Sequence, residues 1–287
     1  MPELPEVETT VRDLKRKVLE RTIFDVWTDF EKMIKKPSFE QFKKEIKGKK
    51  IERVWRRGKN ILFDLSGEKT LLIHQKLSGH LLYGKWQMEN GKWKPEKKGP
   101  LEEKINSYIH LMFTFDDGQM LALSDLRKFA KVELLNKEEL KKEISILGAE
   151  PLEKSFTLKK FKEVLGKRKG KIKQVLMDQS VIAGIGNIYS SEILWEAKVN
   201  PFKEVEKLTN KELERIYEAM KKVLKRAIEL KGESISDFRR ISGEKGFFDR
   251  ARKVYRREGK KCPRCGSKIL KKEIGGRSAY FCPNCQK

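Results

Sequence analysis

The first residues of the chain carry a helical pattern of apolar positions. Val7, Val11, Leu14 and Val18 recur at intervals of three or four, so they share one face of a helix. Glu6 and Glu8 would lie in its first turn, where acidic side chains favour a helix start. The pattern therefore predicts a helix that anchors the N-terminus.

A period of two replaces the helical period in the next part of the chain. Ile109, Leu111, Phe113 and Phe115 alternate along one strand face, and a turn at 116–118 follows them. Similar runs with glycine-containing turns between them predict an antiparallel β-sandwich or barrel. The expected strands cover 51–55, 61–65, 71–75, 81–86, 108–115 and 120–123.

Glycine and proline at 147–152 interrupt both periods and mark a domain boundary. Helical patterning follows this boundary, which predicts an α-helical domain. Its expected helices cover 161–165, 172–177, 188–196 and 211–230.

All four cysteines of the chain lie near its end, in two Cys-x2-Cys pairs with sixteen residues between them. They are Cys262, Cys265, Cys282 and Cys285. This spacing is typical of a four-thiolate site for one structural Zn2+ ion, and disulfides are the alternative. Segments 268–273 and 278–281 predict a hairpin around a two-glycine turn, with Arg277 at its tip. Such an arginine suits phosphate contact, whereas a purely structural clamp is the other interpretation.

The net charge of +24 over 287 residues indicates the chemical class of the binding partner. An excess of this sign indicates a polyanion, and nucleic acid is the first candidate. A lysine- and glutamate-rich surface of a heat-adapted protein is the alternative, although it does not explain a one-sided charge. No apolar run approaches the roughly 20 residues that span a bilayer, so we expect a soluble intracellular protein.

Pro2 is the first candidate for catalysis. Removal of Met1 would expose a secondary amine, and an α-amino group has a pKa of about 7.7 to 8.0, so part of it is unprotonated near neutrality. Attack of this amine on a sugar carbon gives an iminium ion, which permits strand cleavage by β-elimination. Glu3 and Glu6 are candidate proton donors and acceptors beside it. Many chains simply begin Met-Pro, which is the alternative.

The run Gly184-Ile185-Gly186-Asn187 precedes an expected helix. Two glycines at a helix start let the backbone approach an anion, and Asn187 can donate to a phosphate. Taken alone, the run is also consistent with a simple turn between helices.

Read together, these motifs resemble the formamidopyrimidine-DNA glycosylase family of base-excision repair enzymes over essentially the whole chain. The carriers are Pro2-Glu3-Leu4-Pro5-Glu6-Val7-Glu8, Arg57-Gly58-Lys59, His74-Gln75-Lys76-Leu77-Ser78-Gly79, Ser124-Asp125-Leu126-Arg127-Lys128-Phe129, Leu176-Met177-Asp178-Gln179, Gly184-Ile185-Gly186-Asn187-Ile188-Tyr189 and the cysteine hairpin.

The resemblance implies an α+β multidomain fold with an N-terminal antiparallel β-sandwich, a helix-two-turns-helix domain and a C-terminal β-hairpin zinc finger. The expected boundaries are 1–135 for the catalytic sandwich, 136–156 for a linker, 157–240 for the helical DNA-binding domain, and 241–287 for the base-capping loop and zinc finger.

The resemblance also implies the catalytic roles. Pro2 is the nucleophile, and Glu3 is the proton donor for opening of the sugar ring. Glu6 supports the lesion and its sugar. Lys59 contacts phosphate and assists β-elimination, and Arg277 binds the lesion's phosphates and acts in δ-elimination.

Base flipping leaves a gap in the duplex that inserted side chains must fill. The DNA-contacting positions that the resemblance implies are His74, Leu77, Tyr108, Arg127, Phe129, Lys169 and Asn187. Leu77, Arg127 and Phe129 are the gap-filling residues among them, with Arg127 facing the orphaned cytosine. A solvated basic loop is the alternative interpretation of Lys169.

The chain departs from the usual family pattern at several of these positions. Leu77 replaces a methionine, and Leu126 and Lys128 replace a proline and an arginine. Tyr108 stands where some relatives have a DNA-contacting histidine, for which His110 is a weaker substitute.

The expected activity is that of a bifunctional DNA glycosylase and AP lyase that removes 8-oxoguanine and formamidopyrimidines, followed by β,δ-elimination. An endonuclease VIII-like enzyme for oxidised pyrimidines and a noncatalytic zinc-finger DNA-binding protein are the alternatives. The expected partner is double-stranded DNA with oxidised bases or abasic sites. The protein would act as a monomer, without membrane association, in the bacterial cytoplasm and at the nucleoid.

Overall fold

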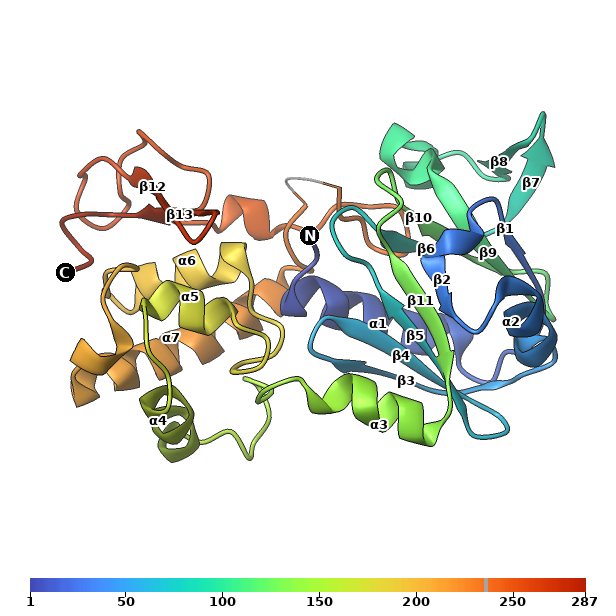
Figure 1. The fold of residues 1–287 in the computed structure, drawn as a ribbon. Helices are drawn as coiled ribbons and strands as arrows, with labels where there is room; N and C mark the ends of the chain where they lie inside the picture. The colour runs from blue at the N-terminus through green and yellow to red at the C-terminus, as the bar shows by residue number, and fades with distance from the viewer. Residues whose placement is uncertain (235–236) are drawn as a thin grey trace. The chain divides into compact units, whose positions relative to one another are not determined.

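The chain forms two compact units in a computed structural model that describes residues 1–234 and 237–287 (Figure 1). Unit 1 contains Met1–Ser145 and Leu230–Asp249, and unit 2 contains Ile146–Glu229 and Arg250–Lys287. The chain therefore leaves unit 1, builds most of unit 2, and returns to unit 1 before it forms the C-terminal finger. The boundaries expected from the sequence stay a prediction.

Two sheets make up the frame of unit 1. One has the strand order β1-β9-β10-β6, and the other has the order β2-β11-β5-β4-β3. Their strands are β1 (Ile23–Thr28), β2 (Ile34–Lys36), β3 (Ile51–Arg57), β4 (Asn60–Leu65), β5 (Lys69–His74), β6 (His80–Gly84), β9 (Ile109–Phe115), β10 (Met120–Ser124) and β11 (Lys131–Leu135). The named pairings are antiparallel except β2 with β11, which is parallel.

One apolar core lies between these two sheets. Phe113 on β9 and Leu123 on β10 belong to the same buried cluster as Phe63 on β4 and Ile73 on β5. Because alternate residues of each strand point to the same face, the period-two pattern puts these side chains together. The predicted β-sandwich is confirmed.

Helix α1 (Leu4–Val18) adds its apolar face to this core. Val7, Val11, Leu14 and Val18 are each at most 2% exposed and belong to the cluster between the sheets. Burial of four aliphatic side chains at about 1.5 to 3 kcal/mol each fixes the start of the chain. The predicted anchoring helix is confirmed.

The remaining elements of unit 1 are smaller. The predicted strand over 81–86 divides, because β6 ends at Gly84 and a separate two-stranded hairpin begins at Trp86. The hairpin consists of β7 (Trp86–Glu89) and β8 (Lys92–Pro95). The other remaining elements of unit 1 are α2 (Phe39–Ile46), α3 (Lys137–Ser145) and the 3-10 turns η1 (Glu31–Met33), η2 (Pro100–Glu102) and η3 (Lys104–Ser107).

Unit 2 contains the helical part and the C-terminal hairpin. The predicted helices are confirmed as α4 (Leu158–Gly166), α5 (Ile172–Met177), α6 (Asn187–Glu196) and α7 (Asn210–Glu229), with η4 (Val205–Lys207) between the last two. The predicted hairpin is β12 (Leu270–Ile274) paired with β13 (Arg277–Phe281). The turn η5 (Phe248–Arg250) lies where the chain passes between the units. None of the helices in the described parts of the chain is long and apolar enough to cross a membrane.

Candidate functional site

The N-terminal residues of unit 1 are buried and hydrogen-bonded. Pro2 is buried, and Glu3 and Glu6 are 2% and 1% exposed. The backbone N–H of Glu3 donates to Oε2 of Glu6 at 2.8 Å, and the N–H of Glu233 donates to Oε1 of the same carboxylate at 2.8 Å. Glu6 therefore holds the residue next to Pro2 and joins it to a segment 227 positions later in the chain.

Gly232 lies against this carboxylate and has a φ of +78°. A Cβ at this position would lie 2.8 Å from Oε1 and 3.0 Å from Cγ of Glu6. The left-handed φ and the close approach both favour glycine. Gly232 thus lets the returning segment reach Glu6.

The structure retains Met1 in front of Pro2, so its amino group marks the electrostatic surroundings of the N-terminus. Burial lowers the pKa of this amine. The carboxylates of Glu3, Glu6 and Asp237 act in the opposite direction, and the ammonium of Lys59 lowers the pKa as well. The N-terminus therefore shares its surroundings with three predicted site residues and with Asp237.

Lys59 lies in the tight turn between β3 and β4. Gly58 has a φ of +57°, and its carbonyl accepts a hydrogen bond from Arg56 Nη1 at 2.9 Å. Arg56 also pairs with Glu8 on α1 at 3.2 Å. These contacts fix the turn to the N-terminal helix, and Lys59 is 7% exposed.

His74 ends β5 beside Lys59. Burial, together with the ammonium groups of Lys76 and Lys59, lowers the pKa of His74 to about 3. Its Nδ1 accepts the backbone N–H of Lys76 at 3.0 Å, so the proton of the neutral ring lies on Nε2. His74 can therefore donate one hydrogen bond from Nε2 without carrying a charge.

A buried carboxylate joins the loops that carry the predicted gap-filling residues. Asp125 Oδ2 accepts the N–H of Ala130 at 2.7 Å, and its Oδ1 accepts from the Ser78 hydroxyl. The Ser78 hydroxyl in turn accepts the N–H of Arg127 at 3.1 Å. Asp125 and Ser78 are 0% and 1% exposed, so this network holds the two loops in one arrangement.

The predicted gap-filling residues lie on these two loops. Leu77 precedes Ser78 and is partly exposed, whereas Arg127 is exposed and Phe129 is 56% exposed. The side chains of Arg127 and Phe129 are therefore accessible to a ligand. All three residues are thus carried by the loops that the Asp125 network joins.

Tyr108 and His110 differ in their surroundings. The carbonyl of Tyr108 accepts the N–H of Asp125 at 2.8 Å, so its backbone belongs to the same loop system, and its side chain is partly exposed. His110 Nδ1 instead lies 2.8 Å from a carboxylate oxygen of Asp29. His110 is thus engaged in a local contact, and Tyr108 is the residue joined to the loops.

In unit 2, Gln179 shapes the glycine turn that precedes α6. Its Oε1 accepts the N–H of Gly184 at 2.8 Å, and its Nε2 donates to the carbonyl of Ile185 at 2.7 Å. Asn187 is the first residue of α6, and its Oδ1 is buried without a hydrogen-bond partner among the described residues. An unpaired amide oxygen does not by itself define a binding site. It shows that the hydrogen-bonding capacity of the Asn187 side chain is not fully satisfied by the described residues.

Lys173 on α5 supports the same turn. It is fully buried and donates to the hydroxyls of Ser190 and Ser191 at 2.7 and 2.8 Å and to the carbonyl of Asn187 at 3.2 Å. The first turn of α6 therefore has a fixed position relative to α5.

The other two predicted DNA-contacting residues of unit 2 are exposed. Lys169 lies between α4 and α5, just before Gly170. Arg277 is the first residue of β13, directly after Gly275 and Gly276, which have φ values of +55° and +68°. This turn type is typical of a two-residue hairpin loop, and it presents Arg277 at the tip as predicted.

The four cysteines form one cluster in which the sulfur atoms all lie within 4.8 Å of one another. Cys262 and Cys285 have an Sγ separation of 4.0 Å, and Cys265 and Cys282 have one of 3.4 Å. Zinc–sulfur bonds of about 2.3 Å in a tetrahedron place the sulfur atoms about 3.8 Å apart. The donor set therefore fits one Zn2+ ion.

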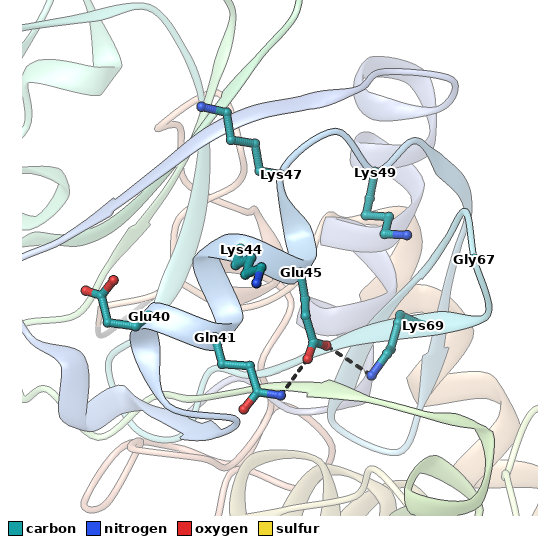
Figure 2. A pocket seen from close by; sticks show the side chains of 8 residues that line it. All are labelled: Glu40, Gln41, Lys44, Glu45, Lys47, Lys49, Gly67 and Lys69. Carbon is teal, nitrogen blue, oxygen red and sulfur yellow. Dashed lines mark hydrogen bonds and ion pairs between the residues drawn. The ribbon is translucent and has the colours of Figure 1, made fainter.

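A surface hollow of about 930 Å3 lies elsewhere in unit 1, between α2 and the β4–β5 turn (Figure 2). Glu45 on its wall accepts from Gln41 at 2.7 Å and pairs with Lys69 at 3.0 Å. The predicted site residues are not part of its lining, which consists of Glu40, Gln41, Lys44, Glu45, Lys47, Lys49, Gly67 and Lys69. This hollow is therefore not the candidate site.

Three family models match successive parts of the chain. The formamidopyrimidine-DNA glycosylase N-terminal domain matches residues 1–132, the H2TH domain of the same family matches 147–239, and a zinc finger found in FPG and IleRS matches 259–287. A formamidopyrimidine-DNA glycosylase of Pelotomaculum thermopropionicum is 40% identical, with 100% of this chain and 99% of the relative covered. The chain belongs to the formamidopyrimidine-DNA glycosylase family.

Solved structures of the family agree over the full length. A Lactococcus lactis FPG mutant in complex with a Fapy-dG containing DNA has a TM-score of 0.87 and 34% identity, with 100% of both chains covered. A MutM structure in complex with carbocyclic 8-oxo-G containing DNA has a TM-score of 0.86, 34% identity and the same coverage. The formamidopyrimidine-DNA glycosylase fold is thus present from end to end.

Sequence reasoning did not assign a role to several residues that shape this formamidopyrimidine-DNA glycosylase site. Asp125 and Gln179 lie inside motifs that were recognised, so their positions gave a signal. Lys173 lies at the end of a basic run, so its sequence gave no signal that its side chain is buried. Gly232 and Asp237 gave none, because their relation to the N-terminus depends on the fold.

Proposed function

We propose that the chain is a bifunctional DNA glycosylase and AP lyase of base-excision repair that removes oxidised purines, namely 8-oxoguanine and formamidopyrimidines. The observation that carries the proposal is the surroundings of Pro2, which is buried next to the acids Glu3 and Glu6. In the chain that keeps Met1, burial lowers the pKa of the Met1 amine, and Glu3, Glu6 and Lys59 act on that amine electrostatically. After removal of Met1 the amine of Pro2 would lie in the same surroundings, where burial favours its unprotonated form.

The reaction begins when Met1 has been removed. The nitrogen of Pro2 forms a bond to the C1′ atom of the damaged nucleotide, the glycosidic bond breaks, and the base leaves with its electron pair and takes up a proton. Glu3 donates a proton to the sugar ring oxygen, so the ring opens to an iminium ion. Loss of a C2′ proton then breaks the bond to the 3′ phosphate oxygen, which is β-elimination.

Lys59 and Arg277 carry the later steps in the proposal. Lys59 contacts phosphate and assists β-elimination, and Arg277 binds the lesion's phosphates and assists the second elimination at the 5′ side. Zinc, when bound, holds the hairpin that carries Arg277 and takes no part in the chemistry. The two-glycine turn supports this role because it exposes the arginine at the tip.

Leu77, Arg127 and Phe129 fill the gap that the flipped nucleotide leaves. Their exposure supports this role, since an apolar wedge and a donor for cytosine must both be accessible to DNA. Asn187, Lys169, His74 and Tyr108 contact the DNA in the same proposal. We further propose that the protein acts as a monomer in the bacterial cytoplasm, on double-stranded DNA.

Borohydride reduction tests the proposal directly. Protein processed to begin at Pro2, as checked by intact mass, should give a covalent adduct with an 8-oxoguanine duplex. The control is the same chain with Met1 retained, because its Pro2 nitrogen is then a tertiary amide without a usable lone pair. Absence of an adduct with fully processed protein would refute the proposed enzymatic activity and favour a noncatalytic DNA-binding protein.

A dihydrothymine duplex in the same assay separates the two enzymatic alternatives. We expect faster adduct formation with 8-oxoguanine. Faster trapping on dihydrothymine would assign the chain to oxidised pyrimidines, as in endonuclease VIII.

A further inference from the structure

The zinc cluster is in contact with a side chain of helix α6. Trp195 lies in the last turn of this helix, is 6% exposed, and belongs to the same buried cluster as Cys262 and Cys282. Its indole Nε1 is 3.4 Å from Sγ of Cys262. Indole nitrogen only donates, so the sulfur is the acceptor.

Arg264 fixes the orientation of this indole. Its guanidinium carbon lies 4.0 Å from the centre of the Trp195 ring, and its Nη1 donates to the Trp195 carbonyl at 2.9 Å. A cation on the ring face and a backbone hydrogen bond hold the ring in one place. Because Arg264 lies between Cys262 and Cys265 in the sequence, it also puts a positive charge within the first cysteine knuckle.

Glu192, one turn earlier on α6, holds the backbone that leads into the knuckle. Its carboxylate accepts the N–H groups of Lys253, Val254 and Tyr255 at 2.8, 2.9 and 2.8 Å. Three hydrogen bonds fix the approach of the chain, so the contact between Trp195 and Cys262 does not depend on a mobile linker. One helix therefore supports both the entry to the finger and one of its ligands.

We propose that Trp195 is a positioning residue of the zinc centre, whose N–H stabilises the Cys262 thiolate and thereby slows both release of the ion and oxidation of the sulfur. A Zn2+ ion with four thiolates carries two net negative charges, and hydrogen-bond donors around such a site offset them. The inference rests on the zinc centre alone and is independent of the glycosylase chemistry.

Zinc release from the full-length holoprotein to a chromogenic chelator tests the role. Trp195→Phe keeps an aromatic ring and removes the N–H donor together with part of the buried ring volume. We expect zinc affinity to fall by about 10- to 100-fold and release to accelerate accordingly. The matched control is Trp93→Phe in unit 1, because the Trp93 Nε1 has no hydrogen-bond partner among the described residues. Its release rate should equal that of the wild type.

Cobalt substitution gives a readout that loss of packing alone would not produce. Removal of a hydrogen bond to a thiolate raises the energy of its lone pairs. The sulfur-to-Co2+ charge-transfer band of Trp195→Phe should therefore move to longer wavelength. Arg264→Gln removes the cation from the face of the indole but keeps the indole N–H. Zinc release from this variant should also accelerate, by a smaller factor than in Trp195→Phe.

The proposal would be overturned by wild-type release and an unshifted band in Trp195→Phe, even if the variant unfolds at a lower temperature. It would also fail if Trp93→Phe lost zinc as fast as Trp195→Phe. Because neither measurement uses DNA, failure of the borohydride trap would leave this result unaffected.

Discussion

Burial lowers the pKa of two groups near the N-terminus. These groups are the Met1 amine and the imidazole of His74, and both are pushed toward their neutral forms. A neutral imidazole donates a single hydrogen bond of fixed direction.

His74 also makes stability depend on pH. Its folded pKa of about 3 is below the unfolded value of about 6.5, so its contribution is complete above pH 6.5 and is lost as the pH falls toward 3. At about pH 4.5 the loss is up to about 2.7 kcal/mol. In His74→Asn, whose side-chain oxygen can still accept the Lys76 N–H, urea unfolding should show a smaller fall in stability between about pH 7 and pH 4.5. If the free energy of unfolding fell equally with pH in the wild type and in His74→Asn, the role of His74 in this pH dependence would be contradicted.

At this scale, the sequence suggested roles where a side chain belongs to a local motif. Roles were predicted for Pro2, Glu3 and Lys59 because each lies in a short run of characteristic residues, and these roles stay predictions. Asp237 was missed because its relation to the amine exists only after the chain returns to unit 1. The exposure of Phe129 could not be predicted either, because nothing in the neighbouring sequence distinguishes it from a core phenylalanine at the start of a strand.

Helix α6 links two features of unit 2. It begins at Asn187, which is proposed to bind phosphate, and it ends beside the zinc ligands. Between these ends Glu192 is buried, and burial raises its pKa although its three backbone hydrogen bonds favour the ionised form. Protonation would place an O–H group against an N–H donor, so the geometry requires the carboxylate.

Glu192→Gln should therefore destabilise unit 2. An amide has one acceptor oxygen, and its NH2 group would face N–H donors, so one or two buried donors lose their partner at a cost of about 1 to 3 kcal/mol. Thermal unfolding of the zinc-loaded protein measures this loss. Glu163→Gln is the control, because Glu163 pairs only with the exposed Lys160 in the named ion pairs and should change stability by less than about 0.5 kcal/mol. Equal effects of the two substitutions would contradict the role of Glu192.

Elements with a clear apolar period were predicted, and length alone did not decide the outcome. Helix α7 and strand β9 carry their pattern over many residues, and α5 was predicted with only six residues. Helix α3 has nine residues but buries none of them, so it carries no such pattern. Strands β1, β2 and β11 and helices α2 and α3 were not predicted. β2 is three residues long and depends on its parallel neighbour β11, so its conformation comes from the sheet and not from its own sequence.

The charge of the whole molecule sets how it meets DNA. A net charge of +24 gives an attraction that does not depend on sequence, and each phosphate contact releases counterions. If six or more phosphates are contacted, affinity should fall by about 10^3-fold or more between about 50 and 200 mM NaCl. Titration of a labelled duplex by fluorescence anisotropy measures the slope. An undamaged duplex should show a similar slope at lower affinity, and a flat salt dependence would contradict phosphate binding.

The fold class of the molecule was predicted from its sequence, and the expected domain boundaries stay a prediction. Motif order predicted a sandwich, a helical part and a finger, and all three are present. The return of Leu230–Asp249 to unit 1 was not predicted, because residues so far from the sandwich in sequence carry no local sign of where they pack.

The hydrogen bond between Glu6 and Glu233 has a consequence for how the protein is made. During translation the first six residues emerge from the ribosome long before residue 233, so Glu6 waits for its second partner until four fifths of the chain exist. A nascent or truncated chain could fold its sandwich yet lack the completed surroundings of its N-terminal amine. Completion of the hydrogen bonds of Glu6 is thus tied to near-complete synthesis of the chain.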